Sequence, residues 1–191
     1  MDRKIIVIDG EPGSHKERLG NQLAGESYSQ LFVEHIPFET IARSLGHSAL
    51  EAIDHKTSYD IMSEALYRQR SAGLLLITNY LQHAEQIEDL YELAMLEDRS
   101  ISGLLIADAP YDEKLLRIIG ESKKPMTVEG AQQHIQEYQQ RNDAIIVELN
   151  YRDVPIEFVE TTGSEERVIG NGVHALQRLL ARDDSKNKRA S

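Results

Sequence analysis

The sequence contains no cysteine, and this absence removes several kinds of chemistry at once. Without thiols the chain can form no disulfide, no thiolate metal site and no cysteine nucleophile. No apolar run approaches the roughly 20 residues that a membrane-spanning helix needs. Residues 1–9 also lack the basic region, long apolar run and cleavage site of a signal peptide. We therefore expect a cytoplasmic protein with no membrane partner.

Basic residues are in the minority. The 191 residues include 21 Lys and Arg against 32 Asp and Glu, which gives a formal charge of −11. Proteins that bind DNA or RNA present a basic face to the phosphates, so this balance argues against a nucleic acid partner. It leaves room for a local phosphate pocket. The hydrophobic fraction of 40% and the charged fraction of 28% are typical of a soluble globular protein.

Short apolar runs alternate with longer amphipathic runs along the chain. Strands are predicted at 4–8, 31–34, 73–78, 103–107 and, at an edge of the sheet, 155–159. Helices are predicted at 16–24, 58–71, 84–96, 111–119, 126–149 and 164–180. Strands that alternate with helices indicate a parallel sheet covered on both faces. We therefore predict a three-layer α/β fold with a five-stranded parallel sheet over residues 1–181, followed by a disordered tail at 182–191.

A glycine-rich turn follows the first predicted strand. It reads Asp9-Gly10-Glu11-Pro12-Gly13-Ser14-His15-Lys16 and leads into a helix. Backbone N–H groups and a helix N-terminus in this layout favour an anion, and the lysine adds a positive charge. Two positions depart from the phosphate-loop pattern G-x-x-x-x-G-K-[ST], because His15 replaces the second glycine and Glu17 replaces the hydroxyl residue. The alternative is a simple turn in which Ser14 is the N-cap of the helix.

These residues resemble the G-x-P-G-x-G-K loop of adenylate kinases and related nucleoside monophosphate kinases. The resemblance continues through 73–86, 107–120, the Glu137-Tyr138 pair and 161–164, so it spans nearly the whole chain. It implies a P-loop kinase-like fold with ATP and Mg²⁺ as cofactors. It also implies a monophosphate-binding helical insert at 38–72 and a remnant lid at 121–127.

The resemblance also implies roles for individual residues. The ATP phosphates would be held by the loop residues Gly10, Gly13, Ser14, His15 and Lys16, of which Lys16 would also be catalytic. Arg117 and Gly163 would lie beside the adenine, and Arg43 and Gln86 would bind the phosphate and the base of the monophosphate.

Each of these residues also has a simpler interpretation. The glycines suit turns, and Lys16 could be a solvated residue of the first helical turn. Arg43 and Gln86 could be exposed helix residues. Arg117 could form an ion pair with Glu113, one helical turn earlier.

Several residues that the resemblance makes catalytic are replaced. Where the family has an aspartate and three arginines, this chain has, in order, Thr78, Gln82, Glu121 and His134. Phosphoryl transfer depends mainly on positioning and on positive charge around the transferred group. We therefore predict a nucleoside monophosphate kinase-like nucleotide-binding protein with weak or lost catalysis. If it is active, it transfers the ATP γ-phosphate to a nucleoside monophosphate; the alternative is a non-catalytic regulatory or partner-binding protein. No two histidines have the spacing of a helical metal site, so we expect no metal-ligating residues of that kind.

Overall fold

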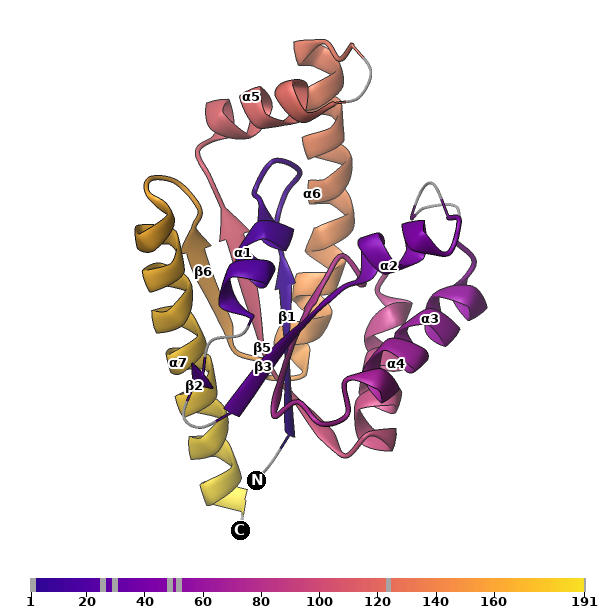
Figure 1. Ribbon diagram of the computed structural model, residues 1–191, viewed down its shortest axis with the longest axis vertical. Helices are drawn as coiled ribbons and strands as arrows, with labels where there is room; N and C mark the ends of the chain where they lie inside the picture. The colour runs from indigo at the N-terminus through magenta and orange to yellow at the C-terminus, as the bar shows by residue number, and fades with distance from the viewer. Residues whose placement is uncertain are drawn as a thin grey trace.

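The computed structural model describes residues 3–24, 27–28, 31–47, 50, 53–122 and 125–190, and for 27–28 and 184–190 the backbone alone. Within these residues one sheet forms the middle layer (Figure 1). Its strand order is β2-β3-β4-β1-β5-β6. Five strands pair in parallel: β1 (Arg3–Asp9), β3 (Leu31–Pro37), β4 (Leu74–Thr78), β5 (Arg99–Asp108) and β6 (Ile156–Glu160). The short β2 (Ser27–Tyr28) pairs antiparallel to β3.

Helices cover both faces of this sheet. One face carries α1 (Lys16–Leu23) and α7 (Glu165–Ala190), and the other carries α2 (Phe38–Ser44), α3 (His55–Arg68), α4 (Glu85–Leu96) and α6 (Val128–Tyr151). Alternate residues of β1 enter the two cores, because successive side chains of a strand point to opposite faces. Ile5 and Val7 pack toward α2, α3, α4 and α6, whereas Ile6 and Ile8 pack toward α1 and α7. A strand buried on both faces explains the continuous apolar run in the sequence.

The predicted strands and helices are present, with a few differences at their ends. The fifth parallel strand, β6, lies at the edge of the sheet as expected. The prediction of a disordered tail from Arg182 is wrong, because α7 continues to Ala190. Asp183 anchors this part of the helix through contacts with Lys4 and with the Ser102 hydroxyl, beyond the apolar stripe that a sequence pattern detects. Ser191 lies outside the described residues.

The insert and the lid remnant can be followed only in part. The expected helical insert at 38–72 contains α2 and α3, although residues 48–49 and 51–52 lie outside the described part of the chain. At the expected lid remnant, α5 (Tyr111–Glu121) ends at Glu121 and α6 begins at Val128, with residues 123–124 undescribed.

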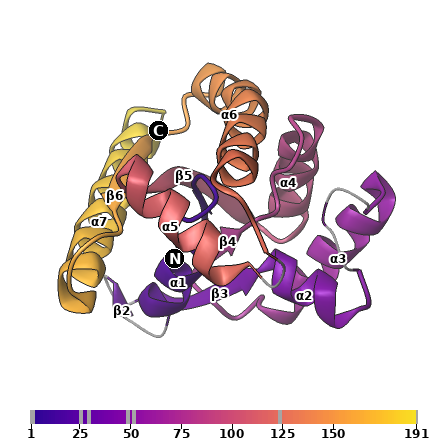
Figure 2. The same ribbon diagram turned by 90° about the horizontal axis from the view of Figure 1, so that it is seen from above.

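The carboxyl ends of the parallel strands meet at one edge of the sheet, which is where open α/β sheets bind ligands. The glycine-rich loop follows β1 at this edge, and α5 crosses above it (Figure 2). None of the helices in the described part of the chain has the length and apolar character required to cross a bilayer.

Candidate functional site

The loop between β1 and α1 is packed so closely that two of its positions require glycine. A Cβ atom at Gly10 would lie 2.4 Å from the Ala107 carbonyl oxygen in β5. Gly13 has a φ of +76°, and a Cβ there would lie 2.6 Å from the carbonyl oxygen of Lys114 in α5. Left-handed backbone and such close approach are both tolerated best by glycine. The loop is therefore fixed between β5 on one side and α5 on the other.

Lys16 opens α1 and turns its ammonium group back over the loop. Its Nζ donates a hydrogen bond to the Gly10 carbonyl oxygen at 3.0 Å and lies 5.8 Å from the centre of the Tyr138 ring. Burial lowers the pKa of Lys16, while attraction by Asp9, Glu39 and Glu17 opposes that shift. The expected position of Lys16 at the loop is thus seen, and the lysine is not a freely solvated side chain.

His15 and Ser14 differ from the expectations for a simple helix cap. The N-cap of α1 is His15, in the left-handed conformation at φ 58°, and it makes no capping hydrogen bond through its side chain. Ser14, the cap in the simple-turn interpretation, is buried, and its Oγ has no partner among the described residues. His15 instead reaches the end of α5, where its Nε2 lies 2.7 Å from Oε1 of Glu121. The simple-turn interpretation is therefore wrong about the cap.

Two cationic side chains of α5, Arg117 and Lys114, bind residues of the loop. Arg117 donates hydrogen bonds to the carbonyl oxygens of Gly13 and Thr161, each at 3.0 Å, and pairs with Glu113 as the simpler interpretation expects. Lys114 is buried between Glu11, with which it forms an ion pair, and Asp108, at 3.1 Å. Burial acts to lower the pKa of Lys114, but the hydrogen bonds to these carboxylates outweigh it and raise the pKa. Contacts with α5 therefore fix the position of the loop.

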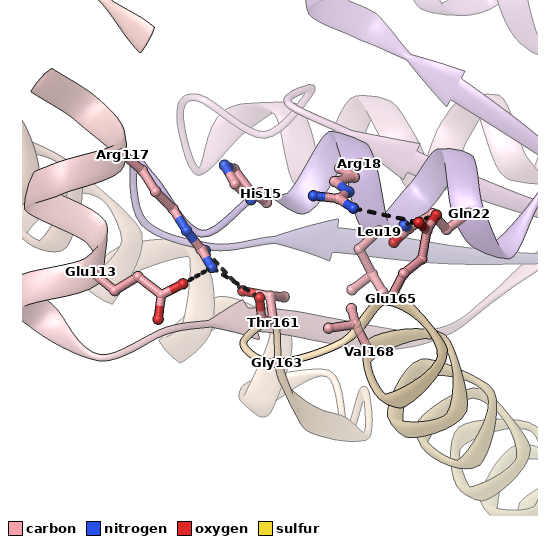
Figure 3. Close-up of a pocket in the computed structure, with 10 residues that line it drawn as sticks. All are labelled: His15, Arg18, Leu19, Gln22, Glu113, Arg117, Thr161, Gly163, Glu165 and Val168. Carbon is pink, nitrogen blue, oxygen red and sulfur yellow. Dashed lines mark hydrogen bonds and ion pairs between the residues drawn. The ribbon is translucent and has the colours of Figure 1, made fainter. Parts of the chain in front are cut away.

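Three of the cavities that border the loop adjoin one another, and we call them A, B and C. Cavity A, of about 270 Å³, lies between the loop, α5 and the turn before α7, as the side chains in Figure 3 show. Cavity B, of about 420 Å³, lies over the loop and shares His15 and Arg18 with cavity A. Cavity C, of about 400 Å³, lies toward α2 and α6 and shares Lys16, Glu39 and Asn79 with cavity B. A ligand longer than one cavity could extend through all three.

Most of the predicted site residues line these cavities. Arg117 and Gly163 line cavity A, Gly13, His15 and Lys16 line cavity B, and Arg43 lines cavity C. In Figure 3, His15 lies between Arg117 and Arg18 at the junction of cavities A and B. Gly10, at the start of the loop, lines none of these three cavities, and its carbonyl oxygen accepts the hydrogen bond from Lys16.

Gln86 is placed differently from both of its predicted roles. Its side chain is buried, and its Oε1 accepts hydrogen bonds from the backbone N–H groups of Gln82, at 2.6 Å, and His83, at 3.0 Å. Its Nε2 donates to the Ser58 hydroxyl at 2.9 Å. Because both ends of the amide are used within the protein, Gln86 is neither an exposed residue nor a group available to a base. It lines none of the cavities A, B and C.

Sequence reasoning missed Asn79 and Arg141. Asn79 follows β4 in a left-handed conformation at φ 61°, and its Nδ2 donates to Glu17 at 2.8 Å and to Glu39 at 3.1 Å. An asparagine after a strand is a recognisable signal, because asparagine tolerates this conformation better than most residues. Arg141 lines cavity C together with His134 and Tyr138. The spacing of these three on α6 could have revealed their shared face.

The carboxylates around the loop do not form a metal centre by themselves. Among the described residues, no group of three or more His, Asp or Glu is arranged to hold a metal ion. Asp9, at the end of β1, accepts a hydrogen bond from the Gly10 N–H at 2.8 Å, and burial raises its pKa against the attraction of Lys16. Buried carboxylates with raised pKa values are common at ligand sites.

Comparison with known proteins bears on the fold. No family model matches the sequence, and no curated protein sequence matches it. Among solved structures, a chain of the Pnkp1/Rnl/Hen1 RNA repair complex is similar, with a TM-score of 0.52 and 11% sequence identity. The match covers 74% of this chain and 46% of that one, so this chain spans less than half of its neighbour. The protein therefore has a three-layer, P-loop kinase-like α/β fold whose sheet contains five parallel strands.

Proposed function

We propose that this protein binds a nucleotide through the loop between β1 and α1, at a nucleoside monophosphate kinase-like site with weak or lost catalysis. The observation that carries the proposal is Lys16, whose partly buried ammonium lies where the loop meets the N-terminus of α1. The first N–H groups of a helix have no acceptor within the helix, so they favour an anion at the same place. A polyphosphate supplies the negative charge that both features favour.

The neighbouring cavities suit the remaining parts of a nucleotide. Cavity A is lined by Arg117, Thr161 and Gly163, and it adjoins cavity B through His15 and Arg18. A base and sugar in cavity A would place the phosphate tail over Lys16 in cavity B. Although the structural neighbour belongs to an RNA repair complex, the formal charge of −11 argues against RNA as the ligand here.

The same residues argue for weak catalysis. Mg²⁺ accompanies phosphoryl transfer in this class of kinase and requires oxygen ligands. Glu17 replaces the hydroxyl that would hold the ion, and its Oε1 already accepts a hydrogen bond from Asn79. We therefore derive no metal-dependent step at this position. Glu121, which replaces an arginine of the family pattern, brings a negative charge to cavity B through its pair with His15.

One observation favours the alternative of a non-catalytic regulatory or partner-binding protein. Helix α5 already ties the loop through Lys114 and Arg117, and His15 is tied to Glu121. A loop held in this way keeps its shape without phosphates. The scaffold could therefore persist after nucleotide binding had been lost.

Calorimetric titration of ATP, ADP and AMP, with and without Mg²⁺, tests the proposal. We expect ATP to bind and Lys16→Ala to weaken it about tenfold or more, because a charge-assisted phosphate contact is removed. Lys56→Ala is the control, since Lys56 is an exposed residue in the first turn of α3. His15→Gly should strengthen binding by removing the left-handed side chain at the mouth of cavity B.

The outcomes separate the candidates. Binding without ADP formation in the presence of AMP, GMP, CMP, UMP or dTMP supports a binding protein. Measurable ADP formation supports the active kinase. If none of the nucleotides binds, the nucleotide proposal is overturned and the scaffold alternative stands.

A further inference from the structure

A fourth cavity, which we call D, lies between the loop, β5, β6 and α6. It has a volume of about 420 Å³, and among the described residues it shares only Tyr138 with cavities A, B and C. Lys16 and His15 line cavity B and not cavity D. The proposed nucleotide site makes no use of this cavity, so its lining points to a ligand of another kind.

The charged side chains that line cavity D are acidic. Glu11 and Asp108 share the single ammonium of Lys114. Asp143, on α6, forms no ion pair and no hydrogen bond within the described part of the chain. When the three carboxylates are ionised, the one ammonium leaves two negative charges uncompensated. The cavity therefore attracts a cation.

Asn142 adds a buried hydrogen-bond acceptor that lacks a donor. The residue is only 8% exposed, and its Oδ1 has no partner among the residues that the structure describes. Asn142 follows Gln139 by three residues and precedes Ile146 by four, so all three line the cavity from one face of α6. An unpaired buried acceptor is unfavourable, and an N–H group of a ligand in cavity D would supply the missing donor.

The rest of the lining is largely apolar. Ile106 and Ala107 of β5 and Ile146 of α6 contribute to it, together with Phe158 of the edge strand β6. Phe158 pairs with Ile106 across the sheet, so both side chains lie on the same face, yet Phe158 is 66% exposed. Covering its ring would remove apolar surface from water, and the face of an aromatic ring also attracts a cation. A hydrated metal ion would not cover this surface, whereas an organic cation would.

We infer that cavity D binds a small organic cation, an ammonium or guanidinium group with an apolar body. The cationic group lies beside Asp143 and donates to Asn142, and the apolar body covers Phe158. This inference does not rest on the proposed nucleotide site, because the residues that carry it lie outside cavities A, B and C.

Nuclear magnetic resonance of the isotope-labelled full chain at neutral pH tests the inference. Phenethylammonium is titrated in parallel with phenethyl alcohol, which has the same apolar body without the charge, and agmatine supplies a guanidinium. We expect the cations to shift the backbone amide signals of Gly10 and Asp108 and the side-chain amide signal of Asn142. Phenethylammonium should bind about tenfold more tightly than the alcohol, because its hydrogen bonds are charge-assisted.

A pair of aspartate variants separates the cavity from the charge of the whole protein. Asp143→Asn removes a carboxylate from the lining, and Asp60→Asn, at an exposed position of α3, changes the net charge equally. We expect Asp143→Asn to weaken phenethylammonium about threefold and to leave the alcohol unchanged. Asp60→Asn should change either affinity by less than about twofold.

A third variant tests the buried acceptor. Asn142→Leu replaces the amide with an apolar group of similar size, and we expect it to weaken phenethylammonium about tenfold. The variant loses an unpaired acceptor, so without ligand it should unfold thermally at or above the wild-type temperature. A large loss of stability together with unchanged cation affinity would show that the amide serves the fold and not a ligand.

The remaining outcomes also decide the inference. Equal affinity for the ammonium and the alcohol would show a merely apolar cavity and overturn it. Equal weakening by Asp143→Asn and Asp60→Asn would show unspecific attraction and overturn it as well. The same conclusion follows if no cation shifts the signals at up to about 10 mM. Nucleotide titrations are read separately, so a failure of either proposal leaves the other standing.

Discussion

His35 lies on β3, behind the loop, and both of its ring nitrogens have partners. Nδ1 lies 2.8 Å from the Asn21 side-chain oxygen, and Nε2 lies 2.9 Å from the Thr78 hydroxyl. Burial lowers the pKa of His35 to about 4, so the ring is neutral near pH 7. A neutral ring suits both contacts, with Nδ1–H donating to Asn21 and Nε2 accepting from Thr78.

The lowered pKa of His35 predicts that the protein loses stability in mild acid. Its folded pKa lies below the unfolded value of 6.5, so the unfolded state takes up the proton first. The contribution is complete above about pH 6.5 and is lost as the pH falls toward 4, by about 3 kcal/mol in total. Urea unfolding of the wild type and His35→Gln across this range should show a shallower pH dependence in the variant. His174→Gln, at an exposed position, should match the wild type, and a wild-type slope in His35→Gln would contradict the assignment.

A comparison of Gly13 with Gly46 distinguishes two reasons why a position requires glycine, namely backbone conformation and lack of space for a side chain. Both have positive φ, +76° and +97°, but only Gly13 is crowded, and nothing lies within 4 Å of a Cβ at Gly46. Gly46→Ala should lower the free energy of unfolding by about 1 kcal/mol, from backbone strain alone. Gly13→Ala should lower it by about 3 kcal/mol, because its Cβ also meets the Lys114 backbone. Chemical denaturation measures both, and equal losses would show that the loop can move away from α5.

At the scale of elements, the packing of α7 on α1 predicts opposite responses at two neighbouring glycines. A Cβ at Gly170 meets nothing within 4 Å, whereas a Cβ at Gly172 would lie 3.0 Å from Leu23 and 3.1 Å from Leu19. Gly170→Ala should raise the free energy of unfolding by about 0.5–1 kcal/mol through helix propensity. Gly172→Ala should be less stable than Gly170→Ala by about 1 kcal/mol or more. Equal stabilisation in urea unfolding would mean that the interface between the two helices is loose.

The elements with a strong local signal could be predicted from the sequence, and the site only in part. Short apolar runs predicted the five parallel strands, and the loop pattern placed Gly10, Gly13 and Lys16 between β1 and α1, because these features depend on neighbouring residues. The role of Gln86 depends on Ser58, which lies far away in the sequence and close in space. The partners of Asn79 likewise come from α1 and α2. Such contacts carry no local periodicity, so sequence reasoning could not find them.

At the scale of the molecule, the first strand and the last helix are joined by a buried ion pair. Lys4 of β1 and Asp183 of α7 are in contact, with side chains only 7% and 14% exposed, and Ser102 donates to the same carboxylate oxygen at 2.9 Å. This contact closes the edge of the three-layer structure opposite the loop between β1 and α1, near both ends of the chain in Figure 1.

Removing the carboxylate should therefore affect the whole fold. Asp183→Asn is expected to lower the free energy of unfolding by about 1–3 kcal/mol, because a buried ammonium loses the charge of one carboxylate that contacts it. Arg178→Gln, which breaks the more exposed pair between α7 and Glu157, should lower it by less than about 1 kcal/mol. Thermal and urea unfolding of the two variants measure the difference. Similar small losses in both would show that the charge of Asp183 contributes little to stability.

The hydrogen bonds and ion pairs between α5 and the loop affect the conformational entropy that ligand binding would cost. A binding loop that is already ordered loses little conformational entropy when its ligand arrives. Arg117 and Lys114 fix the carbonyl of Gly13 and the carboxylate of Glu11 without any phosphate. We expect the amides of Gly10 and Ser14, which already donate to Asp9 and Glu11, to exchange slowly with deuterium in the ligand-free protein, and nucleotide to change their protection little. The scaffold is preorganised, so its affinity depends on charge and fit rather than on folding of the loop.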